Sequence, residues 1–203
     1  MAARNLLKKA DGSIIILERY ELIERINKLN NIRDQALVAF LYLTACRISE
    51  VVPYIVEKKK GIQDTRQLKG EPIKKKQIEF FNDVLIIRQV RTLKRKKYIP
   101  KSIPIVIAKE IKFVEYIKEY TKSLSDEDFL FNMTRQRALQ IMNSIGLYNH
   151  YLRHLRLTHL ATDYGFSGQE LKHFVNWSSS NTADNYVHLN VDNLINKMME
   201  IRK

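Results

Sequence analysis

The sequence predicts a mainly α-helical protein with one small antiparallel β-hairpin or sheet, an α+β fold class. In most segments apolar residues recur every three or four positions, the spacing that gathers them on one face of a helix. Two β-branched runs, "FFNDVLIIRQV" at 80–90 and "KKYIPKSIPIVI" at 96–107, flank the basic "RTLKR", a pattern typical of a hairpin. The chain of 203 residues has 6 Gly, 4 Pro and no internal repeat, which favours a single compact domain over 1–203.

The segment before the hairpin is expected to begin with helices. Apolar residues from Leu22 to Leu29 share one face of a first helix. Asp34 is placed to cap a second helix, which is apolar on almost every side and is therefore expected to be buried. Ser49 is placed to cap a short further turn that Pro53 ends.

Helical spacing returns after the hairpin. We expect helices over 108–124, 132–144 and 150–164, and another over "SGQELKHFVNW" at 167–177. The C-terminal stretch 189–203 repeats apolar residues at the same spacing, which predicts a last helix.

Positive charge predominates and is clustered. There are 35 Lys and Arg against 22 Asp and Glu, a formal net charge of +13. The excess gathers at Lys58–Lys60, at Lys74–Lys76 and in "RTLKRKK" at 91–97. The first two clusters lie in the polar segment 54–79, which is interpreted as a loop or irregular excursion. Such clusters favour a nucleic-acid phosphate backbone as partner, because neutralised phosphates release counterions. A solvated lysine-rich surface is the plainer alternative.

Several classes of protein are disfavoured by what the sequence lacks. One cysteine and no apolar stretch near the first residue argue against a secreted, disulfide-stapled protein, and Cys46, inside an apolar run, is interpreted as a buried structural thiol. The longest apolar run is shorter than the ~20 residues that cross a bilayer, so we expect a cytoplasmic protein without membrane contact. No P-loop, HExxH motif, Cys/His zinc pattern or acidic metal-ligand cluster occurs, so neither a cofactor nor a metal is expected.

A set of residues suited to phosphate chemistry is spread along the chain. Arg47 ends the apolar run "ALVAFLYLTAC", and a guanidinium is rarely buried without an anion. His150 and Arg153 stand three apart in "HYLRHLRLTHL", and Trp177 precedes Tyr186 by nine residues. Two arginines can clamp one phosphate, an imidazole or indole N–H can add a hydrogen bond, and a tyrosine hydroxyl can attack phosphorus. Each residue alone has an ordinary structural explanation; their order and spacing carry the interpretation.

Five motifs follow one another along the chain: "TACRISE", a basic hairpin, "HYLRHLRLTHL", "NWSS" and "NYVH". This series closely resembles the tyrosine recombinase (phage integrase and Xer-type) family, and the resemblance runs from about Leu17 to His188. The resemblance implies the catalytic-domain fold of that family, with a core over about 17–188. It also implies a site-specific DNA recombinase or integrase that cleaves and rejoins strands through a covalent 3′-phosphotyrosine, without metal or ATP. The N-terminal core-binding domain of full-length members is expected to be absent, and the helix at 189–203 is expected either to contact a neighbouring protomer or to pack on its own domain.

The resemblance also implies roles for individual residues. Arg47 and Arg153 would bind the scissile phosphate, and His150 would assist proton transfer. Trp177 would donate its indole N–H to the same phosphate, and Tyr186 would be the nucleophile.

Supporting roles follow in the same way. Glu50 would orient the arginine box, and Lys94 on the hairpin turn would protonate the departing oxygen, with Lys96 as the alternative. Further contacts to DNA are expected from Arg91, Arg95, Lys97 and Arg156.

Two departures from the family pattern concern small residues. Ala45 stands where the family has a glycine in the arginine box, and Asn176 replaces the glycine before Trp177. The first change is expected to shift a turn without abolishing it.

The partners implied are double-stranded DNA and further copies of the chain. A tetrameric synapse is expected on DNA, with weak or no self-association in its absence. The protein is expected to be associated with the nucleoid and to be encoded by a virus, a plasmid or an integrated mobile element. Two alternatives remain: a DNA-binding protein of the same fold without strand cleavage, and a type IB topoisomerase-like enzyme.

Overall fold

The computed structural model describes residues 7, 14–53, 55–60, 63–68, 72–90, 100–148, 150–177, 183 and 186; for 55–60 and 63–68 it describes the backbone alone. The chain divides into two compact units, residues 1–156 and 157–203, and each is considered by itself. The single domain over 1–203 therefore stays a prediction, and the helix predicted over 189–203 lies outside the described residues.

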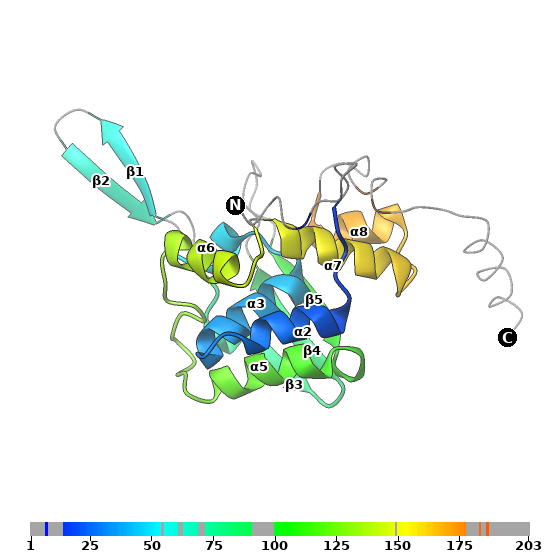
Figure 1. The fold of residues 1–203 in the computed structure, drawn as a ribbon. Coiled ribbons are helices and arrows are strands. Elements are labelled where there is room, and N and C mark those ends of the chain that lie inside the picture. The colour runs from blue at the N-terminus through cyan, green and yellow to red at the C-terminus, as the bar shows by residue number, and fades with distance from the viewer. Residues whose placement is uncertain are drawn as a thin grey trace, which may run out of the picture. The chain divides into compact units, whose positions relative to one another are not determined.

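Among the described elements, the strands of two antiparallel sheets stand between an earlier and a later group of helices in the chain (Figure 1). The helices are α2 (Arg19–Asn27), α3 (Ile32–Thr44), α4 (Ile48–Val51), α5 (Ile111–Thr121), α6 (Arg135–Ser144), α7 (Tyr151–Thr162) and α8 (Gly168–Val175), with short 3-10 turns η1 (Lys75–Gln77) and η2 (Ile107–Lys109). The strands are β1 (Ile55–Lys60), β2 (Gln63–Leu68), β3 (Ile78–Phe81), β4 (Val84–Val90) and β5 (Lys101–Val106).

Helix α3 forms the centre of the first unit. All of its residues from Ala36 to Thr44 are buried, and it packs against both α2 and α5. The Phe40 ring meets Phe131 edge-on at a centroid distance of 5.6 Å, and Tyr42 meets Phe113 at 4.6 Å. The prediction of a buried helix here is confirmed, because an all-round apolar helix needs neighbours on every side.

The three-stranded sheet has the order β3-β4-β5 and is antiparallel throughout. Leu85 pairs with Ile105 and Ile87 with Ile103, and all four side chains are buried on one face. The predicted hairpin is thus confirmed as β4 and β5. A turn at Asn82, whose φ is 29°, splits the run at 80–90 and adds β3 as a third strand.

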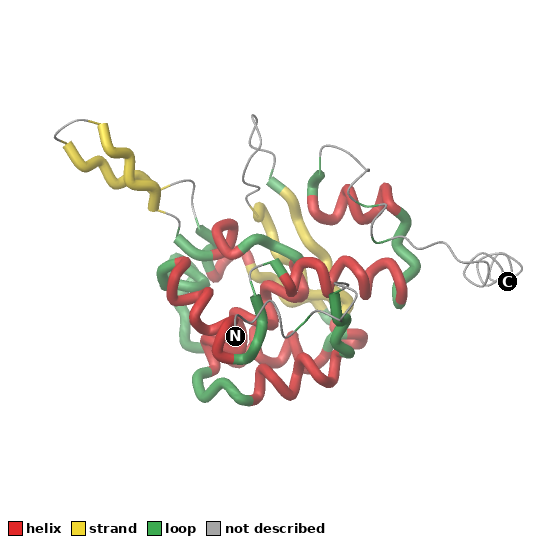
Figure 2. Tube along the Cα trace, turned by 45° about the horizontal axis from the view of Figure 1, so that its top comes forward, coloured by secondary structure: helices red, strands yellow, loops and turns green. Residues whose placement is uncertain are grey.

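The expected loop over 54–79 is a wrong prediction. Strands β1 and β2 pair antiparallel from Ile55↔Leu68 to Lys60↔Gln63, and η1 and the start of β3 follow. Figure 2 shows this two-stranded sheet as a yellow element distinct from the three-stranded one. The lysine-rich composition hid the strands, because lysine has a low β-propensity that cross-strand pairing can override.

Both predicted helix caps were assigned to the wrong residue. Asn31 caps α3 by accepting a hydrogen bond from the Arg33 backbone N–H at 2.9 Å, and Asp34 lies inside the first turn. Arg47 is the N-cap residue of α4, so Ser49 also lies within its helix. The true N-cap residue lies three positions before the expected cap in α3 and two positions before it in α4.

The second unit contains the C-terminal part of α7 and helix α8. Ser167 caps α8, accepting from the Glu170 N–H at 3.3 Å, while the Glu170 carboxylate accepts from the Ser167 N–H at 2.6 Å. The helix ends at Asn176, whose φ of 57° is left-handed. Asparagine is the usual substitute for glycine at such a helix end, which explains how Asn176 fills a glycine position.

Among the helices of the described residues, none combines the length and apolar character needed to span a bilayer.

Candidate phosphate-binding site

Arg47 is held in place by Glu50. The Glu50 carboxylate accepts a hydrogen bond from the Arg47 guanidinium Nη1 at 2.9 Å and another from the Arg47 backbone N–H at 2.8 Å. Glu50 is only 1% exposed, whereas the Arg47 side chain retains 26% of its accessible surface. The buried carboxylate thus anchors a guanidinium that keeps one side open to solvent, the geometry expected of an orienting residue.

Arg153 reaches the same turn from α7. Its Nη1 donates to the backbone carbonyl of Ala45 at 2.5 Å, and the residue is 7% exposed. Ala45 is the C-cap residue of α3 and has a left-handed backbone with φ 49°. The two arginines, 106 positions apart in the sequence, are therefore both tied to the junction of α3 and α4.

The backbone of Ala45 explains why a glycine suits this position. A residue with a Cβ is destabilised by about 1–2 kcal/mol in the left-handed region. Glycine removes this strain, but it also lowers stability by about 0.4–1 kcal/mol because the unfolded chain gains entropy. We expect Ala45→Gly to raise the free energy of unfolding by about 0.5–1 kcal/mol.

The measurement is urea unfolding beside a matched variant, Ala39→Gly. Ala39 is buried within α3, where glycine should cost about 1 kcal/mol. If both variants lose stability equally, the left-handed strain at Ala45 is not significant.

A pocket opens between the two arginines. Arg47, His150 and Arg153 line it together with apolar side chains that include Leu41 and Leu152, and it encloses about 230 Å³, part of it open solvent. All of its lining residues belong to the first unit. A small anion is the group that two guanidinium groups and an imidazole would bind there.

His150 enters this pocket from a strained backbone. Its φ is 70°, a left-handed conformation that histidine adopts more readily than most residues, and its carbonyl accepts from the His154 N–H at 3.1 Å at the start of α7. Partial burial lowers the pKa of the imidazole, and the charges of Arg47 and Arg153 lower it further. All of these influences disfavour the charged imidazolium relative to a solvent-exposed histidine.

Lys101 is a cation close to this site that the sequence analysis missed. It opens β5, and the charged groups around its ammonium include Glu50, Arg153 and Arg47. Burial lowers its pKa most, the nearby Cys46 and Glu50 raise it, and the two arginines lower it. A signal was present: Lys101 shares the period of two with Ile103 and Ile105, so it falls on the buried face of its strand.

Cys46 is confirmed as a buried thiol without a disulfide. Burial raises its pKa, with Lys101 as the strongest opposing influence. A raised pKa keeps the thiol protonated and unreactive.

Trp177 and Tyr186 come together in the second unit. Their rings stack with centroids 6.1 Å apart and planes inclined by 22°. Tyr186 is 9% exposed, and its backbone N–H donates to the Ala183 carbonyl at 2.9 Å. The indole thus lies against the ring of the expected nucleophile and limits the positions that ring can take.

Most of the predicted basic contacts cannot be compared with the structure. Five of them lie outside the described residues: Arg91, Lys94, Arg95, Lys96 and Lys97. Arg156 is described, but it is 3% exposed and pairs with Glu110 inside the first unit. A buried, paired guanidinium has no surface for a DNA backbone, so the expected contact from Arg156 is not supported.

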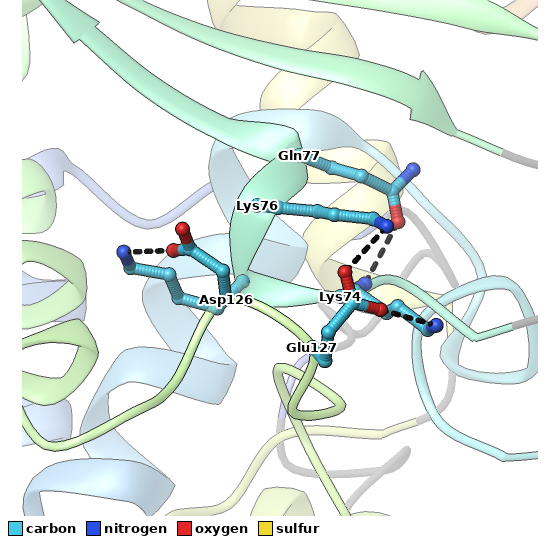
Figure 3. A network of polar contacts seen from close by, with 6 residues as sticks. Lys74, Lys76, Gln77, Asp126 and Glu127 are labelled. Atoms are coloured by element: carbon cyan, nitrogen blue, oxygen red, sulfur yellow. Dashed lines mark hydrogen bonds and ion pairs between the residues drawn. The ribbon is translucent and has the colours of Figure 1, made fainter.

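The cluster Lys74–Lys76 is also paired within the protein. Lys74 and Lys76 donate to the Glu127 carboxylate at 2.9 and 2.7 Å, and Lys75 donates to Asp126 at 2.5 Å (Figure 3). The bonds from Lys76 and Lys74 lower the pKa of Glu127 to about 2. These lysines join η1 to the loop that follows α5, so their charge is not by itself a sign of a phosphate partner.

Within the described part of the chain, no group of three or more His, Cys, Asp or Glu side chains is arranged to hold a metal ion.

Comparison with known proteins gives a match in structure alone. No protein-family model matches the sequence, and no curated protein does. A XerH site-specific recombinase bound to palindromic difH substrate, in a post-cleavage complex, is similar with a TM-score of 0.56 and 18% identity over 92% of this chain and 53% of that one. XerA recombinase gives a TM-score of 0.58 and 18% identity over 92% of this chain and 65% of that one.

A third similar structure is a Tn1549 transposon integrase in complex with a circular intermediate DNA. Its TM-score is 0.56, with 16% identity over 91% of this chain and 65% of that chain. The present chain thus spans between about half and two thirds of the length of these proteins. At these identities the likeness establishes the fold.

Proposed function

We propose that this chain, which has the catalytic-domain fold of the tyrosine recombinases, catalyses site-specific cleavage and rejoining of DNA strands. The observation that carries the proposal is the charge around the pocket of the first unit. Arg47 and Arg153 line the pocket, and the charges of both act on the ammonium of Lys101 nearby. Glu50 pairs with Arg47 and also acts on Lys101.

This charge balance favours an anion. A buried or half-buried cation loses hydration, and the loss is recovered when a negative group comes within hydrogen-bonding distance. A phosphodiester carries one negative charge and two non-bridging oxygens, which suit two guanidinium forks. Glu50 fixes Arg47 and the Ala45 carbonyl fixes Arg153, so little conformational entropy is lost when the phosphate binds.

The same groups support a phosphoryl-transfer step. In the proposed reaction the Tyr186 oxygen attacks phosphorus and its hydroxyl proton passes to the His150 imidazole. A P–O bond to tyrosine forms, and the bond to the 5′ oxygen breaks. Arg47 and Arg153 stabilise the charge that grows on the non-bridging oxygens, with His150 and the Trp177 indole as additional donors. The departing oxygen takes a proton from Lys94, or from Lys96 as the alternative. Attack by the new 5′-hydroxyl reverses the step and restores Tyr186.

Double-stranded DNA is the proposed partner. The net charge of +13 attracts a polyanion, and the similar Tn1549 integrase structure is a complex with a circular intermediate DNA. Assembly into a tetramer on DNA, and an origin in a virus, plasmid or integrated element, belong to the same proposal.

Covalent trapping tests the proposal directly. The protein is incubated in EDTA and low salt with nicked duplexes drawn from its own genome, in which cleavage releases a short fragment and prevents religation. After denaturation in detergent, DNA that remains attached to the protein is sequenced, and the attached peptide is identified by mass spectrometry. We expect a 3′-phosphate ester on Tyr186.

The other outcomes distinguish the alternatives. Binding to the same duplexes without attachment would favour a DNA-binding protein of this fold. Attachment accompanied by supercoil relaxation, but no exchange between sites, would favour a topoisomerase. Attachment that requires a divalent metal would contradict the proposed mechanism.

His150 should report phosphate binding through its pKa. In the empty pocket Arg47 and Arg153 lower that pKa, and a bound phosphate offsets their charge, so we expect the pKa of His150 to rise when DNA binds. Binding should then be coupled to proton uptake, and DNA affinity should increase as the pH falls from above the pKa of the bound state toward that of the free state.

The measurement is an NMR titration of the imidazole with and without DNA, in a Tyr186→Phe background that prevents cleavage. His173 in α8 serves as the reference resonance, since it lies outside the pocket-lining residues. An unchanged or lowered pKa of His150 in the complex would show that it does not face the phosphate.

A further inference from the structure

Arg156 takes part in a buried polar cluster beside the candidate site. Its guanidinium Nη1 donates to Glu110, the residue that precedes α5, and both residues are at most 3% exposed. The Arg156 Cζ also lies 5.2 Å from the centroid of the Tyr42 ring. Burial raises the pKa of the Tyr42 hydroxyl, while the charge of Arg156 and a hydrogen bond from it act in the opposite direction.

Arg156 contacts the end of α3 as Arg153 does, but one helical turn later along α7. Arg153 and Arg156 are three residues apart on α7 and therefore lie on the same side of that helix. Their partners on α3, Ala45 for Arg153 and Tyr42 for Arg156, are also three residues apart. Two successive turns of α7 are thus fastened to two successive positions at the end of α3, in opposite chain directions.

Glu110, the partner of Arg156, also contacts residues of two further helices, α2 and α5. Its second carboxylate oxygen lies 3.5 Å from the Arg19 Nε at the start of α2, and its backbone carbonyl accepts from Val114 in the first turn of α5. Arg156 therefore joins α7 to α2, α3 and α5 at once. A slip of α7 along α3 would break the contacts of Arg156 with Glu110 and Tyr42 together with the bond from Arg153 to Ala45. Packed helices shift between discrete positions rather than continuously.

We propose that Arg156, held by Glu110 and Tyr42, is a positioning residue that fixes α7 against the end of α3 and thereby sets Arg153 at the phosphate pocket. The proposal rests on the proposed function for its effect on cleavage. Arg156 itself lies outside the residues that line the pocket, so it acts through Arg153. A displacement of Arg153 by about 1 Å is enough to slow a phosphate-transfer step by about a hundredfold.

The decisive variant replaces the ion pair by apolar groups of similar size, Glu110→Leu with Arg156→Met. Such an exchange is often neutral or stabilising, whereas removal of one partner leaves a buried charge. The Arg19 side chain, 27% exposed, can then be hydrated. A matched control makes the same exchange at the exposed pair of Glu79 and Arg88, Glu79→Leu with Arg88→Met.

Three quantities are measured for each protein: the melting temperature, the dissociation constant for DNA, and the single-turnover rate of covalent attachment to a nicked duplex. We expect the Glu110/Arg156 variant to fold and to bind DNA within about twofold of the original protein, but to attach about 10- to 100-fold more slowly. The control pair should leave all three unchanged. Unchanged attachment in the folded Glu110/Arg156 variant would overturn the proposal.

A second readout needs neither DNA nor activity. The Nε–H resonance of Arg153, followed by NMR in the DNA-free protein, should shift in the Glu110/Arg156 variant and stay in place in the control. If the original protein forms no covalent complex with DNA, the proposed recombinase function is wrong. The Arg153 resonance then still tests whether Arg156 positions Arg153. If the double variant does not fold, Arg156→Lys replaces it: the charge remains, but the fork that spans Glu110 and Tyr42 is lost, and the resonance should again shift. An unmoved Arg153 resonance would refute the inference.

Discussion

On the proposed function, we expect Tyr186→Phe to lower covalent attachment to DNA to background, a loss of at least about 10⁴-fold. The change removes one oxygen and keeps the ring that stacks on Trp177. Since stacking and burial of the ring are retained, folding and DNA binding should be retained too, with the dissociation constant within about twofold. The measurement is detergent-resistant labelling of the protein by a nicked duplex, alongside a gel-shift titration.

The matched control is Tyr20→Phe. Tyr20 is 63% exposed on α2 and takes no part in the pocket, so its loss of an oxygen should leave attachment unchanged. Covalent complexes that persist in Tyr186→Phe would assign the nucleophile to another residue. Loss of attachment in both variants would indicate a general effect on the fold.

Truncating Arg153 to alanine should slow strand cleavage by about 10²- to 10³-fold, the ~2.7–4 kcal/mol that is typical of losing one preorganised donor to a transition state. Arg153→Lys should recover only part of this rate, because an ammonium keeps the charge but not the planar fork that spans two phosphate oxygens. DNA affinity should change much less than the rate, since a single phosphate contact contributes little to binding along a whole duplex. Single-turnover cleavage and filter binding measure the two effects.

Arg47 offers a second truncation that must be interpreted together with stability. Arg47→Ala leaves the buried Glu50 carboxylate without this guanidinium, so a cost in folding stability accompanies the loss of a phosphate donor. Arg47→Lys preserves the charge beside Glu50 and is the better comparison. Arg88→Ala, at an exposed arginine on β4, is the control. Near-normal cleavage in the variants of both Arg47 and Arg153 would place the phosphate pocket elsewhere.

Local pattern was enough to predict most helices and the hairpin. The helix predicted over 108–124 is α5, and the helix predicted over 150–164 is α7. Prediction was weaker at the element ends, where Asn31 rather than Asp34 caps α3. Several neighbouring residues can act as caps, and the packing of the whole helix decides among them.

The strands β1 and β2 show a different limit. Their residues are charged and polar, so no hydrophobic alternation indicates a strand. Pairing between the two segments, from Ile55↔Leu68 onward, is what defines them.

At Ala45 and Asn176 the sequence analysis and the structure agree. Sequence comparison marked Ala45 and Asn176 as departures from a glycine pattern, and both have left-handed backbones, with φ of 49° and 57°. Both positions therefore have the left-handed backbone that favours glycine.

By itself, the sequence determined the residue types and order of the candidate site. Arg47, His150, Arg153, Trp177 and Tyr186 were named from short motifs whose ordered series resembles the tyrosine recombinases. Such motifs are local, and a helix or turn places their members without help from the rest of the chain. Only the tertiary structure showed that Lys101 lies near Glu50, Arg153 and Arg47 and that Arg156 is buried against Glu110. The reason is physical: burial and ion pairing depend on which distant segments meet, and Arg156 meets a carboxylate 46 residues away.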